Sequence, residues 1–290
     1  MTDRVSTVRV GIVGYGTMGA GIVQVAAAAD CDVVVVDTGE EALERGRALL
    51  LESVHQAVAR GKLADDAPET ILSRVESVTD PRALGDCQIV IETVTELLDV
   101  KAAALEEISR CVDSEAIIAT NTSSLSVTSL AANVSNPSRF AGLHFFNPAP
   151  VMRLVEIIPG IDTAAGTVDR LRVWAAEVGK EPVVVKDQPG FLVNAVLMPY
   201  LNQAVQELDR GLASAEDIDI AVRLGLGYPK GPLELLDLIG LDTHLHATTS
   251  AYEETADARF APPPMLRRLV AAGRLGKKTG SGLRTEERHE

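Results

Sequence analysis

A glycine pattern near the start of the chain constrains the fold most strongly: Gly14-x-Gly16-x-x-Gly19. It follows the apolar run Val8–Val13 directly and opens a segment of helical character. Such glycines permit a tight strand-to-helix turn and let a pyrophosphate approach the backbone N–H groups of the helix N-terminus. The pattern therefore predicts a dinucleotide-binding unit. The predicted pyrophosphate loop comprises Gly14, Gly16, Thr17, Met18 and Gly19.

An acidic residue stands where such a unit needs one. The run Val33–Val36 reads as the second strand, and Asp37 ends it, about 20 positions beyond the glycines. A carboxylate at that place accepts hydrogen bonds from the ribose hydroxyls of NAD and repels the extra phosphate of NADP. The glycines and Asp37 together predict NAD as the cofactor.

The first part of the chain alternates short β-branched runs with helical segments, which predicts a parallel sheet. Helical patterning dominates after the segment Lys186–Gly190. We therefore expect an α/β Rossmann-type domain over residues 1–186 and a smaller all-α domain over residues 187–290. Strands are expected at Val8–Val13, Val33–Val36, Ile89–Ile91, Ala116–Ala119, Phe140–Phe146, Arg153–Ile158 and Pro182–Val185.

Bulk composition narrows the classes of partner. A formal charge of −14 argues against a nucleic-acid partner, which needs a basic face. An anionic small ligand would need a local cluster of Lys and Arg instead. Apolar runs fall short of the about 18 residues that span a membrane, and the start does not resemble a signal peptide. With three cysteines and no Cys-x-x-Cys pair, we expect a cytoplasmic protein.

One carboxylate lies in an apolar strand. Glu156 is flanked by Leu154-Val155 and Ile157-Ile158, and burying an unpaired charge costs several kcal/mol. A partner is therefore expected, and His144 lies in the preceding strand-like run. A carboxylate on one imidazole nitrogen fixes the tautomer and leaves the other nitrogen to act as a base. A structural His–Glu pair is the alternative that the pattern leaves open.

The loop Thr120–Ser124 follows the expected strand Ala116–Ala119. Ligands of open α/β sheets bind at the carboxyl ends of strands, so its hydroxyl and amide groups could polarise a substrate carbonyl. The alternative is that a Ser or Thr before Leu125 only caps a short helix.

Six motifs in order resemble the short-chain 3-hydroxyacyl-CoA dehydrogenases, including the bacterial 3-hydroxybutyryl-CoA dehydrogenases. They are Val13–Ile22, Thr120–Leu125, Gly142–Met152, Pro189–Asn194, Glu216–Asp219 and Gly227–Pro232. The resemblance implies hydride transfer between NAD and C3 of a 3-hydroxyacyl-CoA or 3-oxoacyl-CoA, and a homodimer formed through the helical domain. It also implies an active site in the cleft between the two domains.

The same resemblance implies roles for single residues. His144 would be the general base, Glu156 its orienting partner, and Ser123 and Asn194 would contact the substrate. Lys62 falls where the family places a basic residue near the CoA phosphates; a solvated surface lysine is the alternative. Cofactor contacts are implied for Asp37, Glu96, Lys101, Asn121 and Asn147.

The C-terminus departs from the family pattern. Family members follow Gly-Lys-Lys-Thr-Gly-x-Gly with Phe-Tyr, but here Gly276–Gly282 leads to Leu283-Arg284-Thr285, which puts the terminal packing and part of the dimer contact in question. Other functions compatible with the sequence are a dehydrogenase for an acyl carrier protein thioester or a free hydroxy or sugar acid, and an NAD-binding protein without turnover. No metal site is expected, because His244 and His246 are two positions apart and would not share a helix face.

Overall fold

The computed structural model describes residues 8–284, so the first seven and last six residues of the predicted domains lie outside the described part. The chain divides into two compact units between Gln188 and Pro189. Each unit has its own hydrophobic core. Within residues 8–284, no helix combines the length and apolarity needed to cross a lipid bilayer.

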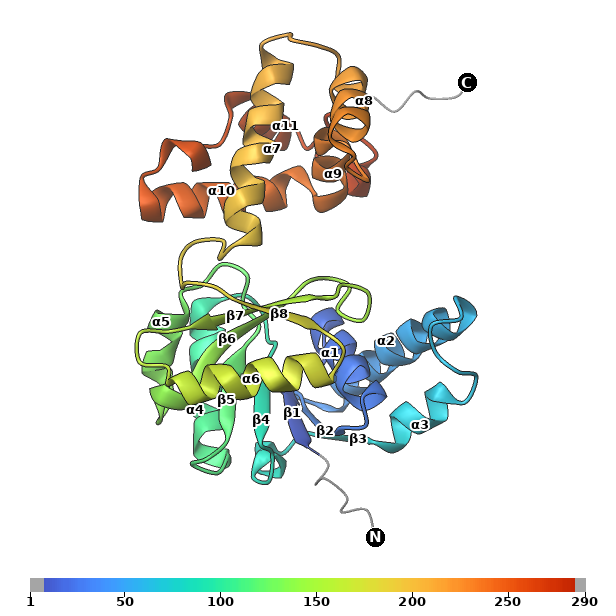
Figure 1. Ribbon diagram of the computed structural model, residues 1–290, viewed down its shortest axis with the longest axis vertical. Helices are drawn as coiled ribbons and strands as arrows, with labels where there is room; N and C mark the ends of the chain where they lie inside the picture. Colours follow the sequence, from blue (N-terminus) through green and yellow to red (C-terminus); the bar gives the residue numbers. More distant parts are fainter. Residues whose placement is uncertain (1–7, 285–290) are drawn as a thin grey trace. The chain divides into compact units, whose positions relative to one another are not determined.

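The first unit is built on one sheet, shown in Figure 1. Within the described residues its eight strands lie in the order β3-β2-β1-β4-β5-β6-β7-β8. Among the pairings of this sheet in the described residues, only β6–β7 is antiparallel. The strands are β1 (Arg9–Val13), β2 (Asp32–Val36), β3 (Val75–Val78), β4 (Ile89–Glu92), β5 (Ile117–Thr120), β6 (Phe140–Phe145), β7 (Leu154–Pro159) and β8 (Glu181–Val184).

This strand order determines where a ligand can bind. Strand β1 lies between β2 and β4, so the chain reverses its direction of travel across the sheet there. Crevices at the carboxyl ends of strands at such a switch point bind ligands in open α/β sheets. Sequence patterning missed β3, because this edge strand has Glu76 and Ser77 exposed and shows no apolar run.

Helices connect these strands and bury the sheet, and their apolar faces carry Val, Ile, Leu and Ala into one core. They are α1 (Thr17–Ala28), α2 (Glu40–Ala59), α3 (Ala67–Ser73), α4 (Leu98–Cys111), α5 (Val127–Leu130) and α6 (Ala165–Glu177), with short 3-10 turns at Pro81–Leu84, Ala131–Asn133 and Pro137–Arg139.

The described part of the second unit is helical, and its core gathers Leu201, Val205, Leu233 and Leu236. Leu283 is buried in this core, and its N–H donates to Asp237 Oδ1 at 2.8 Å. The position at which the sequence departs from the family pattern is therefore packed. The helices are α7 (Val193–Asp209), α8 (Ala215–Leu226), α9 (Pro232–Ile239), α10 (Leu241–Thr255) and α11 (Pro264–Ala271), with 3-10 turns at Ala258–Phe260 and Lys277–Thr279. The predicted fold class, a Rossmann-type domain followed by a smaller helical one, is confirmed.

Candidate active site

The glycine loop has the geometry that a diphosphate requires. Gly14, directly after β1, has φ +95°, a conformation that favours glycine. A Cβ atom on Gly19 would lie 2.0 Å from the carbonyl oxygen of Gly14, so any larger residue would push helix α1 off the turn. Gly16 is the N-cap of α1 and Thr17 and Met18 follow it. Their N–H groups and the positive end of the helix dipole suit an anionic group.

Asp37 lies directly after β2, beside that loop. Its Oδ2 accepts a hydrogen bond from the N–H of Tyr15, and its Oδ1 accepts from the N–H of Thr38, both at 2.7 Å. Each carboxylate oxygen can accept more than one hydrogen bond, so the fixed carboxylate can still bind ribose hydroxyls. A cavity of about 400 Å³ adjoins it. Its apolar walls suit an adenine ring and include Val36, Pro81, Leu84, Val94, Val100 and Ile108. The residues present fit NAD.

His144 and Glu156 form a buried pair. They lie opposite each other in the antiparallel register of β6 and β7, and Nδ1 of the imidazole is 2.8 Å from Oε2 of the carboxylate. Their exposed fractions are 5% and 0%. The imidazole also lies against the ring of Phe146, with centroids 4.5 Å apart. When the ring is neutral and Nδ1–H donates to Glu156, Nε2 is the nitrogen that can exchange a proton with a substrate.

The loop after β5 is held next to this pair. Oδ1 of Asn121 accepts the N–H of Phe145 at 2.9 Å, which ties the loop to the strand that carries His144. The short helix α5 is capped by Ser126, whose hydroxyl accepts the N–H of Ser129. Ser123 is therefore not the helix cap.

Glu96 gathers the hydroxyl and amide groups of this loop on one oxygen atom. Its Oε1 accepts the hydroxyl of Thr122 at 2.6 Å and the N–H of Ser123 at 2.8 Å. It also accepts the hydroxyls of Ser123 and Ser124, at 3.2 and 3.1 Å. Burial disfavours the charged form, but the Lys101 ammonium and these hydrogen bonds outweigh burial and lower the pKa of Glu96.

The other four predicted residues lie at four separate places. Asn147 is exposed in the loop between β6 and β7. Asn194 lies in the first turn of α7, in the second unit. Lys101, on α4, is fully buried, and its Nζ lies 2.9 Å from Glu92 Oε1 and 3.3 Å from Glu96 Oε2. Lys62 is exposed just beyond α2.

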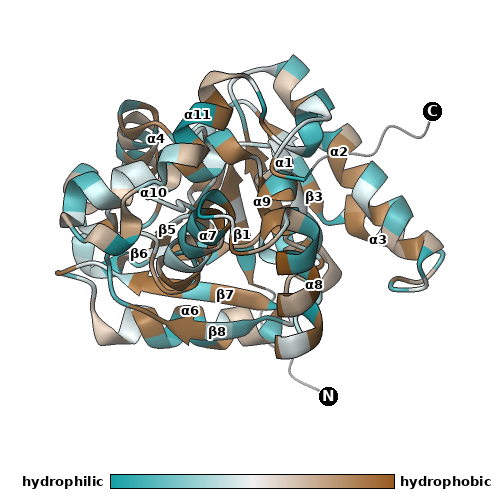
Figure 2. Cartoon of the chain, turned by 90° about the horizontal axis from the view of Figure 1, so that it is seen from above, coloured by the Kyte–Doolittle hydropathy of each residue, from teal (hydrophilic) through white to brown (hydrophobic). Residues whose placement is uncertain are grey.

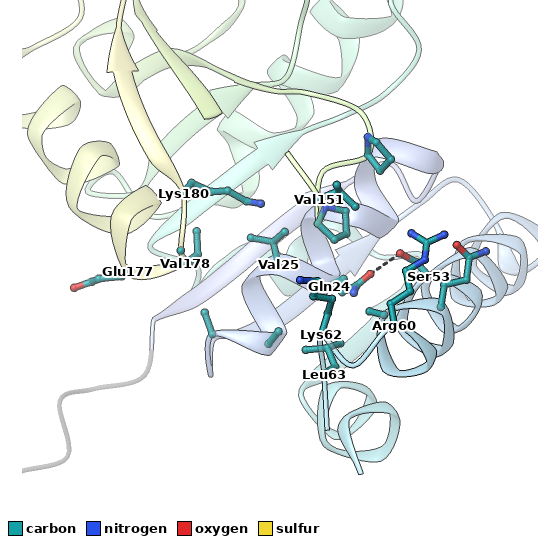
Figure 3. Close-up of a pocket in the computed structure, with 17 residues that line it drawn as sticks. Gln24, Val25, Ser53, Arg60, Lys62, Leu63, Val151, Glu177, Val178 and Lys180 are labelled. Atoms are coloured by element: carbon teal, nitrogen blue, oxygen red, sulfur yellow. Dashed lines mark hydrogen bonds between the residues drawn. The ribbon is translucent and has the colours of Figure 1, made fainter. Parts of the chain in front are cut away.

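Lys62 lines a cavity of about 840 Å³ in the first unit, drawn in Figure 3. Arg60 and Lys180 also line it, whereas Glu177 contributes a carboxylate. Nζ of Lys180 donates to the carbonyl oxygens of Ala149 and Met152, at 2.6 and 2.9 Å, and burial lowers the pKa of this lysine. Arg60, Lys62 and Lys180 form the local cationic cluster that an anionic ligand would need.

Comparison with known proteins decides the family. The NAD binding domain of 3-hydroxyacyl-CoA dehydrogenases matches residues 9–188, and their C-terminal domain matches residues 190–286. The chain belongs to the 3-hydroxyacyl-CoA dehydrogenase family. This confirms the predicted class of enzyme, an NAD-dependent oxidoreductase that acts on a CH–OH group, and the predicted cofactor.

Individual relatives of this dehydrogenase cover nearly the whole chain. A probable 3-hydroxybutyryl-CoA dehydrogenase of Deinococcus radiodurans is 42% identical over 94% of this chain and 98% of its own length. The 3-hydroxybutyryl-CoA dehydrogenase of Mycobacterium tuberculosis is 42% identical over 98% of this chain and 100% of its own. The crystal structure of (S)-3-hydroxybutyryl-CoA dehydrogenase from Ralstonia eutropha superposes with a TM-score of 0.93, at 44% identity, over 96% of this chain and 98% of that one.

Sequence reasoning missed two charged residues of the dehydrogenase. Glu92 is fully buried at the end of β4. It stands after Ile89-Val90-Ile91, so the lone-carboxylate signal that singled out Glu156 could have found it. Lys180 stands between Gly179 and Glu181, before the expected strand Pro182–Val185 rather than inside an apolar run, and gave no such signal. No cluster of three or more His, Cys, Asp or Glu side chains within residues 8–284 could hold a metal ion.

Proposed function

We propose that this dehydrogenase interconverts short-chain 3-hydroxyacyl-CoA and 3-oxoacyl-CoA, with 3-hydroxybutyryl-CoA as the model substrate. The observation that carries the proposal is the buried His144–Glu156 pair, 2.8 Å apart, in the family whose NAD-binding and C-terminal domains the chain matches. The names of the relatives support a four-carbon acyl group.

The proposed chemistry follows from this pair. NAD, when bound, supplies the acceptor for the hydride of C3. His144 removes the proton of the 3-hydroxyl group, and Glu156 stabilises the imidazolium that forms. The Ser123 hydroxyl, which donates to Glu96 Oε1 at 3.2 Å, turns to donate its hydrogen to the substrate oxygen as carbonyl character develops there, while the Ser123 N–H stays on Glu96. General base catalysis of this kind contributes roughly 10²- to 10⁴-fold to the rate. In the reductive direction, the imidazolium returns the proton.

Roles for the remaining residues extend the proposal. Asp37 and the loop Gly14–Gly19 would hold the adenosine and diphosphate halves of the cofactor. Glu96, Asn121 and Asn147 would shape the nicotinamide side at the carboxyl ends of β4, β5 and β6. Asn194 is proposed as a substrate contact from the helical domain, the domain that starts near residue 187.

The cationic cavity supports the thioester carrier. We propose that the phosphates of CoA bind near Lys62 and Arg60, which line the cavity together with Lys180 (Figure 3). In a chain of net charge −14, three cations line this cavity against the one carboxylate of Glu177, and this excess of positive charge provides the local potential that a polyanion requires. An acyl carrier protein carries the same thioester, so the substrate assay has to distinguish the carrier-protein thioester from the CoA thioester.

Assembly and location form the last part of the proposal. Helix α8 exposes Ile220, Leu224 and Leu226, with Leu224 at 75%, and Figure 2 shows brown bands on this helix. Exposed apolar patches mark interaction sites, which supports a homodimer through the helical unit. Cys31, Cys87 and Cys111 are unpaired, which favours a reducing compartment such as the cytoplasm. Light scattering of the wild type and of L224E tests the dimer, and a monomeric wild type would refute it.

The decisive experiment compares three substrates. Oxidation of NADH is followed with acetoacetyl-CoA, acetoacetyl carrier protein and free acetoacetate at equal concentration. We expect kcat/KM for acetoacetyl-CoA to exceed the other two by at least about tenfold, and K62A to raise KM for acetoacetyl-CoA alone. Turnover of the carrier-protein thioester or the free acid in preference to CoA would refute the proposed substrate. H144Q should abolish turnover with all three and leave NADH binding intact.

A further inference from the structure

A second buried ionic group lies next to the proposed site and has no part in the mechanism above. Glu92 ends β4 and Lys101 lies on α4, and both side chains are 0% exposed. The Lys101 ammonium is 2.9 and 3.2 Å from the two carboxylate oxygens of Glu92. Taking two charges out of water costs several kcal/mol per ion, and a pair of hydrophobic residues could fill the same space. A buried pair of this kind is therefore better explained by a positional role than by stability.

The carboxylate of Glu92 is held from several sides. Its Oε1 accepts the N–H of Val94 at 2.7 Å, and its Oε2 accepts the hydroxyl of Thr120 at 2.6 Å. Thr120 is the direct neighbour of Glu92 in the register of β4 and β5, so the sheet itself sets this contact. Because Glu92 cannot move, the Lys101 ammonium that it binds is fixed as well.

The fixed ammonium reaches Glu96. Nζ of Lys101 is 3.3 Å from Glu96 Oε2. Oε1 of the same carboxylate accepts the hydroxyls of Thr122, Ser123 and Ser124 and the N–H groups of Ser123 and Ser124. A continuous chain of contacts thus leads from the centre of the sheet to the loop that carries Ser123.

We propose that Glu92, supported by Thr120, is a positioning residue that holds the buried Lys101 ammonium against Glu96 and thereby fixes the Ser123 loop. Lys101 then acts on this loop through Glu96, because its side chain has no exposed surface. The assignment of Ser123 to the substrate rests on the proposed function, but the chain of contacts does not.

Electrostatics give the proposal a distinctive consequence. The charged groups that face Glu96 are Lys101 from α4 and, behind it, Glu92 from β4. Burial raises the pKa of Glu96, and Lys101 is the largest opposing influence. If the ammonium is lost, the pKa of Glu96 rises. A protonated Glu96 binds the loop less strongly, since charge-assisted hydrogen bonds are roughly twice as strong as neutral ones.

The test removes the buried pair as a unit. In the double variant E92Q/K101M, no unpaired charge is left at these two positions, and the protein should fold even if K101M alone does not. Steady-state kinetics with NADH and acetoacetyl-CoA are measured from pH 5 to 8 beside wild type and E106Q, a matched change of a solvent-exposed glutamate on α4. We expect kcat of the double variant to fall at least tenfold at pH 7. The acid limb of its kcat–pH profile should move to higher pH by about one unit. Its Kd for NADH should stay within about threefold of the wild-type value.

Thr120 provides an independent variant that retains all the charges. T120V should lower kcat several-fold, and T120S should restore it, because the serine hydroxyl can still donate to Glu92. An unshifted acid limb in E92Q/K101M, or equal kcat in T120V and T120S, would overturn the inference. A tenfold weaker Kd for NADH with an unchanged pH profile would show instead that Lys101 contacts the cofactor.

The outcome is separable from that of the proposed function. Wild-type turnover of acetoacetyl-CoA reports on the function alone. Amide hydrogen exchange of Thr122–Leu125 reports on the positioning role alone, and the double variant should exchange there at least tenfold faster than wild type or E106Q. If wild type were inactive but exchange accelerated as expected, the proposed function would fail and the positioning role would stand. Unchanged amide exchange of Thr122–Leu125 in the double variant would refute the positioning role of Glu92.

Discussion

The charge of Glu156 is the property whose removal should be most informative. Glu156→Gln keeps the shape of the side chain and an oxygen that can accept from Nδ1–H of His144. The fold and NADH binding should therefore survive, although Glu156 is fully buried in β7. What the amide cannot provide is a negative charge next to the imidazolium that forms when the hydroxyl proton is taken.

The size of the effect follows from the geometry. Nδ1 and Oε2 are 2.8 Å apart, which puts the centres of the two charges about 4 Å apart, where a pair contributes about 4 kcal/mol at an effective dielectric constant of about 20. Each ~1.4 kcal/mol is about tenfold in rate, so complete loss of this attraction corresponds to about 10³-fold. Because glutamine retains the hydrogen bond, we expect kcat to fall by about 10²- to 10³-fold.

The assay is NADH oxidation with saturating acetoacetyl-CoA, together with fluorescence titration of NADH and thermal unfolding. A matched control is Glu181→Gln on the neighbouring strand β8, where the carboxylate pairs with Arg153 at the surface; this variant should behave as wild type. If Glu156→Gln turned over at more than about a tenth of the wild-type rate while losing thermal stability, Glu156 would be a structural carboxylate, and the catalytic interpretation of the pair would be wrong.

Three further predictions concern the cofactor loop and the helical unit. Asp37→Ser should weaken NADH binding and narrow the enzyme's preference for NADH over NADPH, because the carboxylate that repels the extra phosphate of NADPH is gone. Equal use of both cofactors by wild type would contradict this. Gly19→Ala should raise the Kd for NADH by at least about tenfold, since its Cβ would lie 2.0 Å from the Gly14 carbonyl oxygen, and calorimetry measures it. Burial lowers the pKa of His244 to about 4, below its unfolded value of about 6.5. The unfolded chain therefore binds the extra proton as pH falls from about 6.5 to 4, and this site should remove on the order of 3 kcal/mol of stability over that window. Urea unfolding gives the free energy of unfolding of wild type and of His244→Gln at pH 7 and pH 5. Wild type should lose this stability at pH 5, and the variant, which has no imidazole at this site, should not.

Local sequence patterns were sufficient for the nucleotide-binding half of this protein. The turn after Val13, the helix that begins at Thr17 and the acid at Asp37 depend on backbone conformation and on side chains close to one another in the chain. Steric limits at Gly14 and Gly19 act over a few residues, so the glycine pattern alone is enough to predict the geometry of the turn. The lone carboxylate in an apolar strand likewise indicated a partner, since a buried charge needs one, and His144 in the adjacent run was the one expected.

The tertiary structure decided what depends on residues distant in the chain. Whether the hydroxyls at Thr122–Ser124 capped a helix or were gathered by a carboxylate could not be read from their own segment, because Glu96 lies more than 20 positions earlier. Lys62 and Lys180 are far apart in the sequence, and only the folded chain places both cations around one cavity. Glu92, Thr120 and Lys101 come from two strands and a helix, and no period or motif connects them. Hydrogen bonds and ion pairs act over about 3 Å of space, whatever the distance along the chain, so packing alone could bring this group together.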